Sequence, residues 1–301
     1  YGDNYIRDLI ERHGDDVFIE GICDPMASAS SLYIRIVENS IPIYTDIEEF
    51  YRFHAADLAV ISSPIHTHYS YMMACLSHGS HILCEKPPCV NMDEMEELVE
   101  AEARSGSFIA VGYQLCFSRD VWALKQDILD GKFGRALTMN GLHLLRRGET
   151  YYQRNNWAGK KYIHGCKVYD SPVSNACAHQ LQTMLFLLGA DMESTARISS
   201  VDSLLCRANP LVENFDTAAV HCFLENGTKI LYCTSLWPIM PLRRRIFILA
   251  KMEILTLPWN IRMDGQNLMR IFPRENGCRN WKTVLMLSVQ ENDPTVLSGQ
   301  L

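Results

Sequence analysis

A charged pair follows a short apolar segment in the first third of the chain. Glu85 and Lys86 come directly after the run 81–84 and directly before Pro87 and Pro88. A glutamate and a lysine in a loop are more often a solvated ion pair than a site, whereas a lysine held rigidly at the end of a strand can act on a bound ligand. The two prolines fix the backbone φ of the exit and favour the rigid arrangement. The surrounding elements decide between these interpretations.

Two histidines follow another apolar run. His66 and His68 come after Ser63-Pro64, which ends the run 58–62. A His-x-His pair suggests a metal, but a metal needs further ligands in three dimensions, and the sequence offers no third ligand at a convincing spacing. We therefore expect no metal site, and we place His68, Ser63 and Pro64 beside a bound cofactor.

The segments that carry these residues alternate between strand and helix patterns. Strands are predicted at 17–23, 58–62, 81–84 and 108–113, and helices at 5–12, 67–78 and 91–105. Such alternation predicts a parallel sheet with helices on both faces, because a parallel crossover needs a return of helix length. Ligands gather at the carboxyl ends of the strands in such a sheet. Lys86 is therefore expected at the ligand edge.

An acidic residue at the end of the run 17–23 extends this prediction. Asp24 stands where the second strand of a dinucleotide fold places the carboxylate that accepts hydrogen bonds from ribose hydroxyls and repels the 2′-phosphate of NADP. We therefore predict NAD, with NADP less favoured. Gly2 precedes the first helix, where the third glycine of G-x-G-x-x-G would stand. The first strand and the first two glycines are then expected to be missing from this chain.

Composition limits the partners. The chain has 301 residues, 48% of them hydrophobic, and a net charge of -7 without a long basic block, which argues against nucleic acid. It has no apolar run of about 18 residues and no leader pattern at its start, so we expect no membrane contact. Eleven cysteines without a C-x-x-C pair favour reduced thiols and a cytoplasmic location.

Strand patterns dominate the second half as far as about residue 237. The segments 137–145, 196–202, 217–224 and 228–233 are predicted strands, and Glu225-Asn226-Gly227 is a plausible hairpin turn. A sheet left open on one face usually buries it by association, so a homodimer or homotetramer is expected. The pattern fades after residue 237.

Several of these motifs together resemble a known family. They are Cys23-Asp24-Pro25, Tyr44-Thr45-Asp46, Ser63-Pro64 followed by His68, Cys84-Glu85-Lys86-Pro87, and Gly112-Tyr113. Their order and spacing resemble the Gfo/Idh/MocA oxidoreductases, which include glucose-fructose oxidoreductase and inositol dehydrogenases. The resemblance implies an α/β chain, with an N-terminal Rossmann domain at 1–118 and a C-terminal α+β domain with an open, mainly antiparallel sheet at 119–301. It also implies NAD(P)-dependent oxidation or reduction at a sugar or polyol carbon.

The resemblance also implies the catalytic residues. Lys86 matches the active-site lysine, near the nicotinamide and the reacting hydroxyl. The family's Asp-x-x-x-His signature matches Asn175 and His179, which as positions i and i+4 of a helix would point into one cleft. An asparagine can hydrogen-bond a sugar hydroxyl but cannot take a proton. We therefore predict that His179 accepts the proton and Lys86 polarises the reacting oxygen, with Glu85 turned away toward the backbone or the cofactor side.

Three more residues are predicted to contact a carbohydrate-like substrate. Tyr113 ends the run 108–113, Trp157 can stack on a sugar ring, and Asp170 can replace the carboxylate that Asn175 lacks. The competing interpretations are interdomain packing for Tyr113 and core packing for Trp157. Two other functions stay open: a glycosidase that uses transient oxidation by tightly held NAD, and a non-catalytic dinucleotide or sugar-binding protein, which Asn175 favours.

Overall fold

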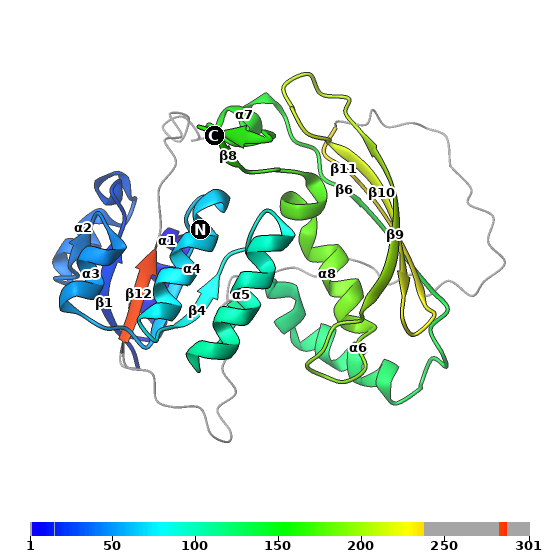
Figure 1. Ribbon diagram of the computed structural model, residues 1–301, viewed down its shortest axis with the longest axis horizontal. Coiled ribbons are helices and arrows are strands. Elements are labelled where there is room, and N and C mark those ends of the chain that lie inside the picture. The colour runs from blue at the N-terminus through cyan, green and yellow to red at the C-terminus, as the bar shows by residue number, and fades with distance from the viewer. Residues whose placement is uncertain (1, 15, 238–282, 288–301) are drawn as a thin grey trace.

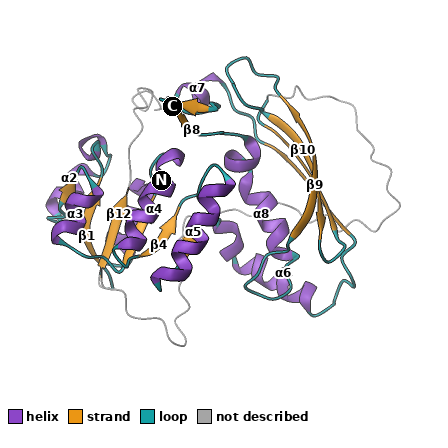
Figure 2. Ribbon diagram, viewed as in Figure 1, coloured by secondary structure: helices purple, strands orange, loops and turns teal. Residues whose placement is uncertain are grey.

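Two sheets stand side by side with helices between them (Figure 1). The computed structural model describes residues 2–14, 16–237 and 283–287. Within these residues, no helix combines the length and the apolar character that a membrane crossing needs. Helices and strands alternate through the first half, and strands predominate after residue 190 (Figure 2).

The first sheet is wholly parallel. Its order is β2-β1-β12-β3-β4-β5, and every neighbouring pair runs parallel. The strands are β1 (Phe18–Cys23), β2 (Ile43–Tyr44), β3 (Leu58–Ile61), β4 (His81–Cys84), β5 (Ile109–Val111) and β12 (Thr283–Leu287). Strand β3 is apolar and buried throughout its length, as expected for a parallel strand covered on both faces.

Helices cover both faces of this sheet. They are α1 (Gly2–Arg12), α2 (Tyr33–Glu38), α3 (Ile47–Phe53), α4 (His68–Ser77) and α5 (Met92–Ser105), with short 3-10 turns at Ala27–Ala29, Ile65–Thr67 and Gln114–Phe117. Leu58 and Val60 of β3 pack in the cluster that contains α1, whereas Ala59 and Ile61 pack in the cluster that contains α3 and α4. The alternation of side chains along β3 therefore divides the core into two layers.

The second sheet has the order β6-β11-β10-β9. Its β6–β11 pair is parallel and its other two pairs are antiparallel, so the sheet is mainly antiparallel. The elements of this half are α6 (Arg119–Leu129), β6 (Thr138–Leu144), α7 (Glu149–Gln153), β7 (Tyr162–Ile163), β8 (Cys166–Lys167), a π-helical turn at Pro172–Ala176, α8 (Ala178–Leu187), β9 (Ile198–Cys206), β10 (Thr217–Leu224) and β11 (Lys229–Ser235).

One face of the second sheet is covered and the other is open. Met184 of α8 packs in the same buried cluster as Cys222 and Tyr232. Side chains of the opposite face are exposed, among them Leu142 at 71% and Leu204 at 66%. The sheet is therefore open on one side, as the sequence predicted.

Strand β12, which is distant in sequence from the other strands, occupies a central position in the first sheet. Strand β12 lies between β1 and β3 and pairs with both (Figure 1). Sequence patterns predicted no strand after residue 237. They also predicted that the first Rossmann strand is missing from the chain. The predicted boundary at residue 118 assigned 283–287 to the second domain, whereas β12 belongs to the first sheet.

Candidate active site

Lys86 joins the two halves of the molecule. It follows β4 and is 8% exposed, and its Nζ donates to Asn175 Oδ1 at 2.6 Å and to the Asn175 carbonyl at 3.0 Å. The loop after β4 is anchored because Glu85 N donates to Ile61 O of the neighbouring strand. Burial lowers the pKa of Lys86, and the nearby carboxylates of Glu85 and Asp170 oppose that shift.

Asn175 also binds a buried carboxylate. Its Nδ2 donates to Asp170 Oδ1 at 2.8 Å, and Gly159 N donates to Asp170 Oδ2 at 2.7 Å. Asp170 is 4% exposed, and burial raises its pKa. The Lys86 ammonium, the Asn175 amide and the Asp170 carboxylate are thus linked by successive hydrogen bonds. Both carboxylate oxygens already accept hydrogen bonds, so this geometry favours a supporting role for Asp170 over the predicted substrate contact.

Glu85 binds a side chain of the first helix. Its Oε1 accepts a hydrogen bond from Tyr5 OH of α1 at 2.9 Å, and burial raises the pKa of the carboxyl. The side chain therefore faces α1, the helix whose amino end borders the expected dinucleotide loop. Whether Glu85 touches a cofactor there stays a prediction.

His179 offers a ring nitrogen without a partner. Its Nδ1 is buried and makes no hydrogen bond within the part of the chain that the structure describes. Burial, assisted by the charge on Lys86, lowers the pKa of His179 to about 4. The ring meets Tyr113 edge-on, with centroids 6.0 Å apart. Tyr113, Lys86 and His179 therefore share one region, which leaves the predicted role of each open to test.

Asn175 and His179 do not share one regular helix. Asn175 lies in the π-helical turn, and His179 lies in α8. Cys177 separates them with φ −120° and ψ 18°, which is not helical. The expectation of a common helix face was wrong, because Ser171 and Pro172 start a separate turn in which the Ser171 side chain accepts from Ser174 N. Contact with Lys86, rather than helix periodicity, positions the amide.

The predicted cofactor residues line the carboxyl edge of the first sheet. Asp24 follows β1 and is buried, and its Oδ1 accepts from Met26 N at 2.7 Å. Ser63 and Pro64 follow β3, where Thr67 Oγ1 donates to Ser63 Oγ and to Pro64 O. Gly2 is buried at the start of α1. Cofactor contacts by these residues remain predictions.

His68 occupies a different environment from the one expected. It is 1% exposed, and its ring nitrogens lie 2.7 Å from Pro87 O and 2.8 Å from Ser63 O. The ring therefore ties the end of β3 to the loop that carries Lys86. This geometry favours a structural role over direct contact with a cofactor.

The carboxyl edge of the first sheet carries side chains that suit the two ends of a dinucleotide. A buried carboxylate at Asp24 matches ribose hydroxyls, and the ammonium of Lys86 stands at the other end with the unpaired His179 nitrogen. No G-x-G-x-x-G segment precedes α1 within the described residues. His66 Nδ1 is buried without a partner, but the described residues contain no group of three His, Cys, Asp or Glu side chains arranged for a metal.

Trp157 packs between the two halves. It lies in a buried cluster with Ile65, Ile163 and Val168, and its Nε1 has no hydrogen-bond partner among the residues that the structure describes. The cluster holds the loop 155–170 against the first sheet, because Ile65 belongs to the turn after β3. Packing therefore accounts for most of the Trp157 surface, and stacking on a sugar stays a prediction.

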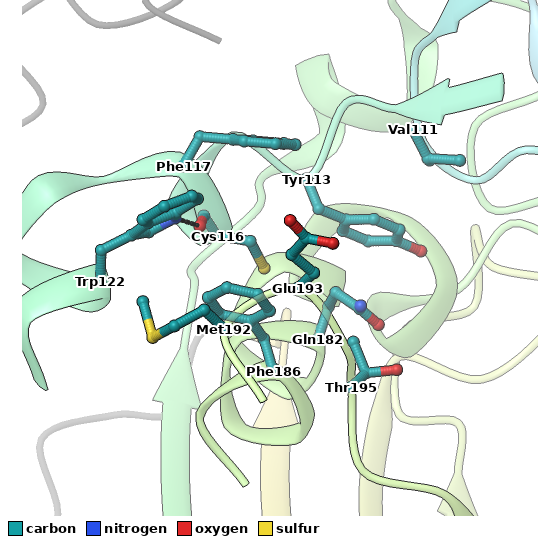
Figure 3. Close-up of a pocket in the computed structure, with 10 residues that line it drawn as sticks. All are labelled: Val111, Tyr113, Cys116, Phe117, Trp122, Gln182, Phe186, Met192, Glu193 and Thr195. Atoms are coloured by element: carbon teal, nitrogen blue, oxygen red, sulfur yellow. Dashed lines mark hydrogen bonds between the residues drawn. The ribbon is translucent and has the colours of Figure 1, made fainter. Parts of the chain in front are cut away.

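A pocket of about 390 Å³ borders the site at Tyr113. Its lining is mainly apolar and aromatic, with the Glu193 carboxylate among the rings of Phe117, Trp122 and Phe186 (Figure 3). Tyr113 thus separates two environments, since it contacts His179 and also lines this pocket.

Sequence patterns did not single out two arginines near the site. Arg147 and Arg154 flank α7, and Arg154 lies close enough to affect the pKa values of both Lys86 and Asp170. The available signal was the basic and aromatic stretch 146–154 directly after a predicted strand.

The first sheet and its edge match a known domain. Residues 1–113 match the family described as "Oxidoreductase family, NAD-binding Rossmann fold". In this domain, which is less than half of the 301 residues, the chain is similar to the Gfo/Idh/MocA oxidoreductases.

Curated proteins that are similar to this chain include inositol 2-dehydrogenases. The enzyme of Rhodococcus jostii (strain RHA1) is 36% identical over 155 residues, which are 51% of this chain and 37% of that protein. The enzyme of Klebsiella pneumoniae (strain 342) is 26% identical over 153 residues, which are 50% of this chain and 41% of that protein. The matched part thus spans well under half of these relatives.

Solved structures share the fold. The WlbA dehydrogenase of Bordetella pertussis, in complex with NADH and UDP-GlcNAcA, has a TM-score of 0.65 and 19% identity, over 78% of this chain and 63% of that one. An Agrobacterium radiobacter oxidoreductase in complex with NAD+, L-tartaric acid and magnesium has a TM-score of 0.58 and 16% identity, over 74% of this chain and 62% of that one. At these identities the likeness establishes the fold alone.

Proposed function

We propose that this protein is an NAD-dependent dehydrogenase that acts on a CH-OH group of a sugar, a polyol or a related carbohydrate derivative. One observation carries the proposal. The buried ammonium of Lys86, which follows β4 and is held by Asn175, lies close enough to His179 for its charge to lower the pKa of that ring, whose Nδ1 has no partner among the described residues. The inositol 2-dehydrogenase relatives support this reaction class.

Lys86 has one donor left for a substrate. An ammonium has three N–H donors, and the two hydrogen bonds to Asn175 use two of them. The remaining donor can bind the oxygen that is oxidised, and it stabilises negative charge on that oxygen as the proton leaves. Asn175 and Asp170 fix the direction of this donor.

His179 is the proposed proton acceptor. Oxidation of an alcohol removes a hydride from carbon and a proton from oxygen, and NAD, when bound, supplies the hydride acceptor. With a pKa of about 4 the imidazole is neutral near pH 7, so Nδ1 can accept the proton. In the reverse direction, the same nitrogen returns the proton to the oxygen.

Cofactor preference, location and assembly belong to the same proposal. Asp24 at the end of β1 supports NAD over NADP, since a carboxylate repels a 2′-phosphate. Every cysteine in the described part of the chain is unpaired, which supports a reducing compartment such as the cytoplasm. The open face of the second sheet supports a homo-oligomer.

Absorbance of NADH tests the function. Turnover with NAD and a panel of sugars, polyols and their derivatives is measured for the unchanged chain and for Lys86→Ala and His179→Ala. Each variant should lose a factor of roughly a hundred or more in rate, with NAD binding retained. Lys132→Ala, which removes a lysine at the exposed end of α6, is the matched control.

Two results would replace this proposal. Full turnover in Lys86→Ala or His179→Ala would remove these residues from the chemistry. Tight binding of NAD without NADH formation on any compound would favour the non-catalytic dinucleotide-binding function, the alternative that Asn175 favours because an amide cannot take a proton. Cleavage of a glycosidic bond with no net NADH would favour the glycosidase.

A further inference from the structure

Two guanidinium groups converge on one aromatic ring beside the proposed site. The Cζ atom of Arg154 lies 3.7 Å from the ring centroid of Tyr151, and the Cζ atom of Arg147 lies 4.6 Å from it. The two guanidinium carbons are therefore separated by no more than the sum of these distances. Like charges held this close repel each other unless an anion lies nearby.

No carboxylate of the described chain forms an ion pair with either arginine. Arg147 Nε is buried without a hydrogen-bond partner among the described residues. Arg154 Nη1 donates to the carbonyl of Tyr151 at 3.4 Å, and the Arg154 Cζ atom lies 5.5 Å from the ring centroid of Trp157. A guanidinium has five donors, so most of the hydrogen-bonding capacity of this pair is unused.

The pair lies close enough to the proposed catalytic residues to act on them electrostatically. Burial lowers the pKa of Lys86 and raises the pKa values of Asp170 and Cys177; the charge of Arg154 adds to the shift of Lys86 and opposes that of Asp170, and the charge of Arg147 opposes that of Cys177. Figure 1 shows α7, which lies between the two arginines in sequence, near the end of the molecule toward which β4 points. The region thus holds three cations, and Asp170 is already engaged by its own hydrogen bonds.

We infer that Arg147 and Arg154 form a subsite for an anionic group of the substrate, a carboxylate or a phosphate. The inference rests on the proposed function, which it narrows from carbohydrates in general to acidic carbohydrate derivatives. Planar guanidinium groups bind both kinds of anion through paired N–H donors, and the Tyr151 ring holds the two guanidinium groups in place.

Binding measurements on the whole chain with NAD present test this subsite. The probes are D-glucuronate, D-glucose 6-phosphate and uncharged D-glucose, each titrated with intrinsic fluorescence as the signal. Arg147→Gln and Arg154→Gln should each weaken at least one charged probe by tenfold or more, because a charge-assisted hydrogen bond is lost. Arg146→Gln, which changes the exposed neighbour, should leave all three affinities unchanged.

The two charged probes distinguish a subsite for a carboxylate from a subsite for a phosphate. A titration with NAD distinguishes a substrate subsite from a contact with the cofactor. Loss confined to glucuronate assigns a carboxylate, and loss confined to glucose 6-phosphate assigns a phosphate. The inference is overturned if the charged probes bind the glutamine variants as they bind Arg146→Gln, if glucose weakens equally, or if NAD affinity falls by the same factor.

Two further readouts keep the result interpretable. Arg154→Lys keeps the charge but loses the paired donors, so it should retain more affinity for the charged probe than Arg154→Gln; equal affinities would point to packing on Tyr151 alone. Because binding needs no turnover, selective loss of charged probes without any NADH formation would leave the subsite standing and reject the dehydrogenase. NADH formation only from uncharged sugars would reject the subsite and leave the dehydrogenase standing.

Discussion

Asn175 connects a cation to a carboxylate through one amide group. Its oxygen accepts from Lys86 and its nitrogen donates to Asp170, so the orientation of the amide is fixed from both sides. An asparagine at this position is thus a positioning residue with a specific partner. It is more than the absence of the carboxylate that the family pattern contains.

Asn175→Asp should create a carboxylate pair that shares a proton. The new oxygen would lie where Nδ2 now stands, 2.8 Å from Asp170 Oδ1, so the pKa of the pair would rise. A raised folded-state pKa gives stability that is present at low pH and lost as pH rises. We therefore expect the thermal unfolding midpoint of Asn175→Asp, relative to that of the unchanged chain, to decrease as the pH is raised from 5 to 8. Circular dichroism measures both midpoints.

The exchange variant Asp170→Asn/Asn175→Asp is the control for this prediction. It keeps one carboxylate and one amide, so the extra pH dependence should disappear. Equal pH dependence in the single and double variants would contradict the proposed proton sharing.

The depressed pKa of His179 makes a separate prediction for activity. Because the neutral imidazole accepts the proton, activity should be lost as pH falls through about 4, rather than through the ordinary histidine range near 6.5. The measurement is kcat/KM against pH in the direction of alcohol oxidation. A limb centred at 6.5 that disappears in His179→Ala would show that the ring titrates as an exposed histidine does.

At the scale of elements, one buried ring holds two loops together. His68 lies between Ser63 O and Pro87 O, which follow β3 and β4. His68→Ala should lower the free energy of unfolding by about 1–3 kcal/mol, because a buried carbonyl loses its partner. Urea denaturation measures this, with His66→Ala as the control two residues away. If His68→Ala also abolished NAD binding in a folded protein, the predicted cofactor contact would regain support.

Strand prediction succeeded where burial alone determines the pattern. The runs 81–84 and 217–224 were predicted with the bounds that the structure shows, because apolar runs that adjoin turn residues are local signals. The short helices α2 and α3 and the strand β2 were not predicted, since elements of this length carry too few apolar positions to show a period.

The sequence named candidate site residues, but it did not predict the contacts between them. Lys86 and His179 were identified through the family resemblance, whereas the contact between Lys86 and Asn175 joins residues 89 positions apart. Neither spacing nor propensity shows which loops of two sheets meet. The anion subsite was missed for the same reason, because Arg147 and Arg154 look like surface charges until Tyr151 brings them together.

At the scale of the whole molecule, the open face of the second sheet predicts assembly. Leu142 and Leu204 are exposed on the face of the second sheet opposite the buried cluster that contains α8, and apolar surface of this kind is commonly buried between copies. Light scattering at micromolar concentration should show an oligomer. Leu204→Glu should shift it toward monomer, whereas Leu129→Glu, on an exposed part of α6, should not. A monomeric unchanged chain would refute the prediction.

The position of β12 determines when the first sheet can be completed during translation. The strand that joins β1 to β3 is contributed by residues 283–287, which lie more than two hundred residues after both partners. The nascent chain therefore carries two partial sheets with unpaired edges until residues 283–287 have been translated. Closing the sheet joins segments more than two hundred residues apart, which makes its completion slow and late. The second sheet, whose strands lie between 138 and 235, can form before that moment.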